Sequence, residues 1–229
     1  MSQLIIKDKS IVVPGEELAT GMDYLPGFGT YRNKDRILAS KLGLANIEGR
    51  AIKVIPLSGQ YAPRQGDEII ARVEDVSFFG WRLDTNSAYP AMLNVKDGVA
   101  DFVSRGADLT SYYNFGDYLV VKIINVTSQK LIDVTMKGPG LRRLDEGRII
   151  KVNAHKVPRI IGKQGSMVTM LKQYTDCRII VGQNGIIWIQ GSPEGELLAV
   201  QTIKEIEEKS HISGLTEQIK EFLEKSKVK

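Results

Sequence analysis

The chain has few of the side chains that bind metals or form cross-links. Its 229 residues include one cysteine, Cys177, and two histidines, His155 and His211. A single cysteine cannot form an internal disulfide, and these three soft ligands are too few for a structural zinc site. We therefore expect no metal and no cofactor, and we expect Cys177, at the start of a predicted strand, to be buried and inert.

Long apolar runs and catalytic motifs are also missing. No stretch approaches the roughly 20 apolar residues of a bilayer span, and the opening MSQLIIKDKS is charged where a secretory signal is apolar. The sequence contains no P-loop, no nucleophile elbow and no paired carboxylates at metal-binding spacing. These absences predict a cytoplasmic protein without catalytic residues and without a membrane partner.

Charge is distributed unevenly along the chain. The net charge is +4, but residues 139–193 contain nine basic and three acidic side chains, a net +6. Residues 65–138 contain seven basic and ten acidic side chains, a net −3. Phosphate groups are the usual partners of a local excess of lysine and arginine, so the positive segment is the first place to look for nucleic-acid contacts.

An internal similarity marks the middle of the chain. GDEIIARVEDV (66–76) and GDYLVVKIINV (116–126) both open with a Gly-Asp turn and continue as β-branched residues alternating with polar ones. With the strand-like FFGWRLDT, AMLNV and LIDVTM, they predict a five-stranded OB-type barrel over residues 65–138. Residues 1–64, rich in glycine and proline between short β-prone runs, predict a separate β domain, and residues 139–146 resemble a linker.

A third domain follows over residues 147–210. Its pattern alternates strand, short helix, glycine loop, helix, strand, GQNG turn, strand and helix, a β-α-α-β-β-α order. Ser192 and Pro193 predict the start of the last of these helices. Residues 211–229 predict a terminal docking helix with a frayed end. The fold class is thus multidomain, mostly β plus α/β.

The chain contains two G-x-x-G patterns. GQNG (182–185) lies between two strands, and its Asn-Gly pair predicts a hairpin turn. Gly162–Gly165 (GKQG) lies between two helices, where glycines let a sugar-phosphate backbone approach the start of the second helix and Lys163 adds a positive charge. The alternative is a tight helix–helix connection whose glycines serve packing or touch a neighbouring domain.

The segment RIIGKQGSMVTMLKQYTDCRIIVGQNGIIWIQG resembles a type I K-homology (KH) domain. That resemblance implies single-stranded RNA held at the glycine loop, with bases over an apolar groove. The residues it implies are Gly162, Lys163, Gln164 and Gly165 for the backbone, and Ile161 and Ile180 for the groove.

The barrel segment resembles the RNA-binding barrel named after the largest small-subunit ribosomal protein, in its Gly-Asp strand openings and its closing LIDVTMKG. Such barrels stack bases on aromatics and place cations beside the backbone. The candidate residues are Phe78, Phe79, Trp81, Tyr89, Arg82, Arg105, Lys122 and Lys130. Adjacent on a predicted strand, Phe78 and Phe79 should point to opposite faces. The alternative is that most of these aromatics fill the barrel and the cations are solvated.

The order of the three domains, with VVPGEEL, GFGTYRNKDRILASKLG and GQYAPRQGDEI, is similar to the ribosomal RNA-processing protein four family, the RNA-binding cap subunit of the archaeal exosome. The resemblance implies three copies on a hexameric ring of RNase PH-type subunits. They would guide the 3′ end of RNA to catalytic sites in the ring, and the N-terminal domain would dock on it. A ribosome-associated or translation factor is the alternative.

Overall fold

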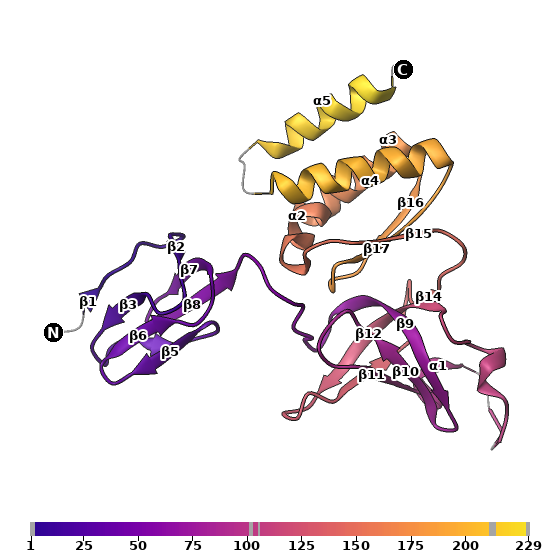
Figure 1. The fold of residues 1–229 in the computed structure, drawn as a ribbon, viewed down its shortest axis with the longest axis horizontal. Coiled ribbons are helices and arrows are strands. Elements are labelled where there is room, and N and C mark those ends of the chain that lie inside the picture. Colours follow the sequence, from indigo (N-terminus) through magenta and orange to yellow (C-terminus); the bar gives the residue numbers. More distant parts are fainter. Residues whose placement is uncertain (1–2, 101–102, 105, 211–213, 228–229) are drawn as a thin grey trace. The chain divides into compact units, whose positions relative to one another are not determined.

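The computed structural model describes residues 3–100, 103–104, 106–210 and 214–227 (Figure 1). The chain divides into two compact units, Met1–Gly59 and Gln60–Lys229. In the described residues, no helix combines the length and the apolar character needed to cross a bilayer.

The first unit is a sandwich of two four-stranded sheets. One sheet has the order β1 (Gln3–Leu4), β3 (Glu17–Thr20), β6 (Arg36–Ala39), β5 (Thr30–Asn33). The other has the order β2 (Ile11–Val12), β7 (Gly43–Glu48), β8 (Ala51–Pro56), β4 (Leu25–Pro26). Side chains from the inner faces of both sheets, including Leu18, Ile37 and Val54, form one buried cluster. The predicted N-terminal β domain is confirmed.

The second unit begins with a closed barrel. Its strands are β9 (Glu68–Ser77), β10 (Gly80–Asp84), β11 (Ala91–Asn94), β12 (Tyr118–Val126) and β13 (Ile132–Thr135). The sheet runs β13–β11–β10–β9–β12, and a further β12–β13 pairing closes it. Helices α1 (Val95–Gly98) and η1 (Leu109–Ser111) lie between β11 and β12. The five-stranded OB-type barrel is confirmed.

The β-α-α-β-β-α order expected after the barrel is also confirmed. It consists of β15 (Arg148–Lys151), α2 (Val157–Ile161), α3 (Ser166–Thr175), β16 (Arg178–Val181), β17 (Ile186–Gln190) and α4 (Pro193–Glu208), with the short 3₁₀ turns η2 (Ala154–Lys156) and η3 (Lys163–Gly165). The Ser192 hydroxyl accepts a hydrogen bond from the Gly195 N–H at 3.2 Å and so caps α4. Helix α5 (Leu215–Lys227) adds Leu215, Ile219 and Leu223 to the core of this domain.

The three-stranded sheet β15–β17–β16 is covered on both faces (Figure 1). Ile187, with its cross-strand partners Ile150 and Val181, packs against the helices. Trp188, one residue later, faces the barrel and joins a cluster with Ile70 and Val120. The segment expected as a linker packs here too: β14 (Arg142–Arg143) pairs with β12, and Leu144 is buried in the same cluster.

Candidate nucleic-acid interface

The glycine loop connects α2 to α3 in a backbone shape that few residues other than glycine adopt. Gly162 has φ 76° and ψ 172°, a region that is almost exclusive to glycine. Gly165 is left-handed, with φ 78° and ψ 11°, and α3 starts at the next residue. Lys163 and Gln164 between them are exposed. The loop therefore presents the Lys163 ammonium group at the start of α3, where the Ser166 N–H already donates to the Lys163 carbonyl.

The two glycines of this loop have different surroundings. A Cβ at Gly162 would lie 2.7 Å from the Met167 nitrogen and 2.8 Å from its Cβ, so Gly162 allows the loop to pack on the first turn of α3. A Cβ at Gly165 would meet only Val168 Cγ1, at 3.9 Å. Gly162 thus fits the packing alternative, whereas Gly165 leaves open space where a ligand backbone could approach.

One predicted groove residue is on the wrong face. Ile161 is partly buried and packs against the hydrophobic cluster between the sheet and the helices of this domain, the helix-side cluster. Ile180 is the cross-strand partner of Trp188. It packs against the cluster that Trp188 forms with Ile70 and Val120 of the barrel, on the other face of the sheet. Because side chains alternate along a strand, its neighbours Ile179 and Val181 are the β16 residues on the helix side, in the same cluster as Ile161.

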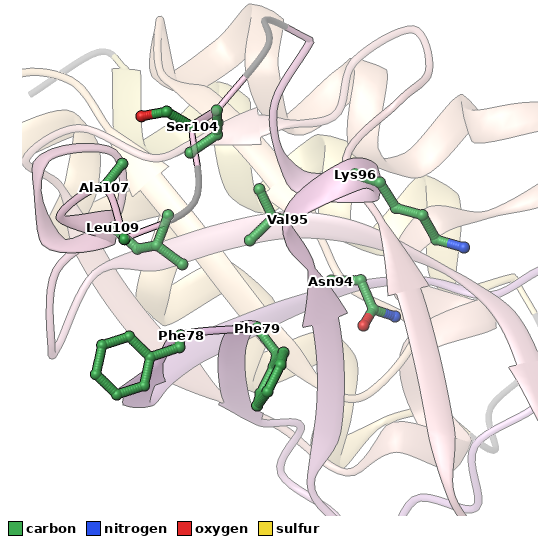
Figure 2. Close-up of a pocket in the computed structure, with 10 residues that line it drawn as sticks. Phe78, Phe79, Asn94, Val95, Lys96, Ser104, Ala107 and Leu109 are labelled. Atoms are coloured by element: carbon green, nitrogen blue, oxygen red, sulfur yellow. The ribbon is translucent and has the colours of Figure 1, made fainter.

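Phe78 and Phe79 lie in the turn between β9 and β10, not on a strand. The prediction of opposite faces is therefore wrong: both side chains are exposed, at 89% and 79%. They border a pocket of about 320 Å³ whose floor includes Val95 and Leu109. Figure 2 shows both rings projecting from the hairpin tip. Asn94, which the sequence interpretation did not single out, lies in the same pocket.

Trp81 is a core residue and its ring cannot stack on a base. It is fully buried, its indole N–H donates to the Tyr113 carbonyl at 2.9 Å, and its ring meets that of Tyr113 edge-on at 5.0 Å. On β10 it alternates with the exposed Arg82, so the strand places Trp81 inside the barrel. The core-filling alternative holds for this aromatic residue.

Two of the other residues predicted to bind RNA lie close together. Arg82 and Tyr89 line a second pocket of about 390 Å³ together with Glu74 and Asp84. Arg82 Nε lies 3.4 Å from a carboxylate oxygen of Glu74, so part of its charge is already neutralised. Lys122, on β12, and Lys130, in the turn after it, are exposed but line neither pocket. Arg105 lies outside the described residues.

Comparison with known proteins places this geometry in a family. Residues 147–205 match the KH domain family, and residues 9–58 match the family described as the Exosome RNA binding protein RRP4 N-terminal domain. The exosome complex component Rrp4 of Methanothermus fervidus is 40% identical over 224 residues, which cover 97% of this chain and 99% of that protein. The chain belongs to the Rrp4 family.

Another Rrp4 protein and a solved structure support the same family assignment. The exosome complex component Rrp4 of Pyrococcus furiosus is 40% identical over 227 residues, covering 97% of this chain and 86% of the relative. A crystal structure assigned as an exosome complex RNA-binding protein superposes with a TM-score of 0.65 at 34% identity, covering 73% of this chain and 97% of the other.

The second glycine pattern has a role that the sequence interpretation of this Rrp4-family chain missed. GQNG forms the predicted turn between β16 and β17, but it also binds the barrel. The fully buried Asn184 donates from Nδ2 to the carbonyls of Ile70 at 2.7 Å and Thr85 at 2.8 Å. Its Oδ1 accepts from the Ile70 N–H at 3.3 Å. Asn184 is more than 90 positions from both Ile70 and Thr85 in the sequence, so only the fold brings it beside them.

Gln183 and Gly182 complete this contact. The Gln183 N–H donates to the Glu68 carbonyl at 2.9 Å, and its side-chain oxygen accepts from the Glu68 N–H at 2.7 Å, so Gln183 pairs with the start of β9 as a strand residue would. A Cβ on Gly182 would lie 2.8 Å from the Ile70 nitrogen. Of the two loops, GQNG is therefore the one whose glycine lets the barrel approach.

Metal-ligating clusters and shifted pKa values are the features of titratable groups that would point to catalysis. No group of three histidine, cysteine, aspartate or glutamate side chains in the part of the chain that is described could hold a metal. Burial raises the pKa of the Cys177 thiol, which is buried as expected. Burial, together with a hydrogen bond to Asp67, raises the pKa of Tyr61. Both shifts disfavour the anionic forms that a nucleophile or base would need.

Proposed function

We propose that this chain is a cytoplasmic, non-catalytic RNA-binding cap subunit of an exosome. It recruits single-stranded RNA and directs the 3′ end into the channel of a hexameric ring of RNase PH-type subunits, on which three copies sit. Degradation or tailing of the RNA takes place in the ring. The family membership supports a place in such a complex, because the relatives are named as exosome components.

The observation that carries the RNA-binding role is the open face of the glycine loop. Gly165 leaves room for a sugar-phosphate backbone, and Lys163 is exposed beside it. Within the described residues Lys163 forms no ion pair, so its charge is available to a phosphate. Ile161 and Val181, on the helix side of the sheet, offer an apolar surface for bases.

The barrel contributes by position more than by charge. Its segment carries a net −3, and Glu74 lies against Arg82, which weakens long-range attraction of RNA. The exposed rings of Phe78 and Phe79 suit stacking with unpaired bases of any sequence. A strand already delivered to the barrel would therefore be held at the β9–β10 tip without strong sequence preference.

The N-terminal unit is assigned the docking role. Ten of the 18 large hydrophobic side chains that are exposed in the described residues lie between Ile5 and Leu57. Exposed apolar side chains in this density are typical of protein–protein contacts.

The experiment that tests this function reverses the charge of the loop. Lys163→Glu should weaken binding of a single-stranded RNA by about tenfold and reduce the dependence of log K on log salt by about 0.7 or more. Binding is measured by fluorescence anisotropy on the full chain assembled with its ring, over a salt series. Lys225→Glu, at a lysine on α5 that is also exposed, changes the net charge by the same amount and should leave the affinity within twofold.

Two outcomes would contradict the proposal. Equal effects of Lys163→Glu and Lys225→Glu would show that only net charge matters and would remove the loop from the RNA path. Turnover of RNA by the purified chain alone, with magnesium and phosphate, would show that the subunit is itself a nuclease.

A further inference from the structure

The turn that precedes β12 presents one aromatic ring to solvent. Its sequence YYNF (112–115) holds three aromatic residues, of which Tyr112 and Tyr113 pack against the barrel core. Phe115 does not join that core, and its side chain is 66% exposed. It also lines neither of the two pockets described above. The barrel therefore carries a third exposed phenylalanine, apart from the pair at the β9–β10 tip.

Backbone hydrogen bonds fix the position of this turn. The Gly116 N–H donates to the Val73 carbonyl at 2.9 Å, and the Val73 N–H donates to the Asp117 carbonyl at 2.8 Å, so the turn is attached to β9. The Asn114 side-chain oxygen accepts from the Phe115 N–H at 2.7 Å. A carboxylate oxygen of Asp117 accepts from the Asn114 N–H at 2.8 Å. Because its backbone is already ordered, this turn would lose little freedom when a ligand binds.

Arg72 places a positive charge beside the ring. It is exposed on β9 between the buried Ala71 and Val73, and its guanidinium carbon lies 5.7 Å from the centroid of the Phe115 ring. Arg72 forms no ion pair within the described residues, although Asp84 is its cross-strand partner on β10. A ring and a free guanidinium side by side offer a stacking surface to a base and a partner to its phosphate.

The place of this pair on the barrel fits a strand that is already held at the tip. Arg72 and Ser77 lie on the same strand β9, about 17 Å apart at the usual rise per residue, and the tip with Phe78 and Phe79 follows Ser77. Barrels of the OB type bind about 4–16 nucleotides, more than two neighbouring rings can stack. An RNA strand at the tip therefore needs further contacts on the barrel, and β9 leads from the tip to Phe115.

We propose that Phe115 and Arg72 form a second stacking platform for single-stranded RNA. An unpaired base of any sequence stacks on the Phe115 ring, and an adjacent phosphate contacts the Arg72 guanidinium. The proposal rests on the proposed function, because it assumes that the chain binds RNA, and it adds a contact outside the glycine loop and the β9–β10 tip.

The surroundings of the platform favour a nucleotide over a protein partner. Next to Arg72 on the outer side of the barrel are the carboxylates of Glu74, two residues along β9, and Asp84, on β10. The centre of a protein interface is depleted of charged residues, so a single ring among charges is a poor anchor for a protein. The same carboxylates weaken the long-range attraction of RNA, and stacking on Phe115 then supplies most of the affinity at this platform.

The test measures RNA affinity of the full chain over a salt series, by fluorescence anisotropy with a fluorescein-labelled single-stranded oligouridylate. Phe115→Ala should weaken binding by about fivefold or more, the usual effect of removing one stacking partner. Its dependence of log K on log salt should equal that of the unmodified chain, because stacking releases no counterions. Arg72→Gln should reduce that dependence by about 0.7, the value for one phosphate contact on a single strand.

Two further variants serve as controls. Phe115→Trp keeps an aromatic face and should retain the affinity of the unmodified chain. Phe28→Ala removes a matched ring from the N-terminal unit, 46% exposed with the Lys41 ammonium 5.0 Å from its centroid, and should leave the affinity within about twofold. Circular dichroism and thermal melting confirm that each variant is folded.

The outcomes separate the platform from the proposed function. If Lys163→Glu weakens RNA binding and Phe115→Ala does not, the platform is overturned while the proposed function stands. If Phe115→Ala leaves RNA affinity unchanged and weakens binding of the chain to the purified ring, measured by biolayer interferometry, the ring of Phe115 is a protein contact and the proposal is wrong. If the unmodified chain does not bind single-stranded RNA, the proposed function itself fails.

Discussion

Among single residues, the two glycines of the GKQG loop have different structural roles. Gly162 holds a conformation close to exclusive to glycine and packs against Met167, whereas Gly165 needs only a left-handed backbone and faces open space. One glycine of the motif is thus required by packing and the other by backbone conformation, although its four letters look symmetrical.

This difference predicts unequal costs for the same substitution. Gly165→Ala should lower the free energy of unfolding by about 1 kcal/mol, the cost of a left-handed alanine. Gly162→Ala should cost about 3 kcal/mol or more, because the added Cβ also has to displace the first turn of α3. Urea unfolding followed by tryptophan fluorescence measures both. Equal losses would show that α3 adjusts to the methyl group without strain.

At the scale of elements, the β16–β17 turn connects the KH domain to the barrel. Asn184 fills its hydrogen-bonding capacity with backbone groups of Ile70 and Thr85, and Trp188 packs beside it against Ile70 and Val120. A polar contact with every group satisfied is specific in geometry as well as stabilising. The GKQG loop therefore belongs to a domain that is held on the barrel by this contact.

Removing that amide should uncouple the two domains. Asn184→Ala leaves buried backbone groups of Ile70 and Thr85 without a partner and should cost about 3 kcal/mol. Asn184→Asp should cost more, because a carboxylate would face two carbonyl oxygens. Gln183→Ala, which removes a single acceptor and keeps its backbone bond, should cost about 1 kcal/mol.

Differential scanning calorimetry distinguishes these variants. The unmodified second unit should melt in one transition, and Asn184→Ala should separate the barrel and KH transitions. A single unshifted transition in Asn184→Ala would mean that the apolar cluster alone holds the domains together.

At the scale of the whole molecule, a buried thiol reports on the opening of the KH domain. Cys177 lies in the main core of that domain, its thiol donates to the Thr175 carbonyl at 3.3 Å, and burial raises its pKa. Both burial and the raised pKa keep the reactive thiolate scarce while the domain is folded.

Thiol labelling should therefore follow unfolding of the KH domain. We expect Cys177 to react with a thiol reagent at neutral pH at a rate that rises with urea in parallel with the fluorescence transition, and to be silent in the folded chain. Because this is the chain's single cysteine, mass spectrometry of the intact protein is sufficient. Labelling of the folded protein at the rate of an exposed thiol would show that the core opens locally.

From the sequence alone one could predict a β-rich N-terminal segment, the five barrel strands, the β-α-α-β-β-α order that follows them, the capped start of α4 and the position of the glycine loop. These features depend on residues within a few positions of one another: the period of the apolar side chains, a serine before a proline, glycines between two helices. The turn that exposes Phe78 and Phe79 was the local feature that was missed, because an apolar pair beside strand residues is typical of a strand.

Which surroundings each side chain meets depends on the tertiary structure. Trp81 is inside the barrel, Ile180 is turned toward the barrel and not toward the helices, and Asn184 is a contact between domains as well as a turn residue. The physical reason is that alternation along a strand defines two faces, whereas what covers each face depends on contacts between residues far apart in the chain.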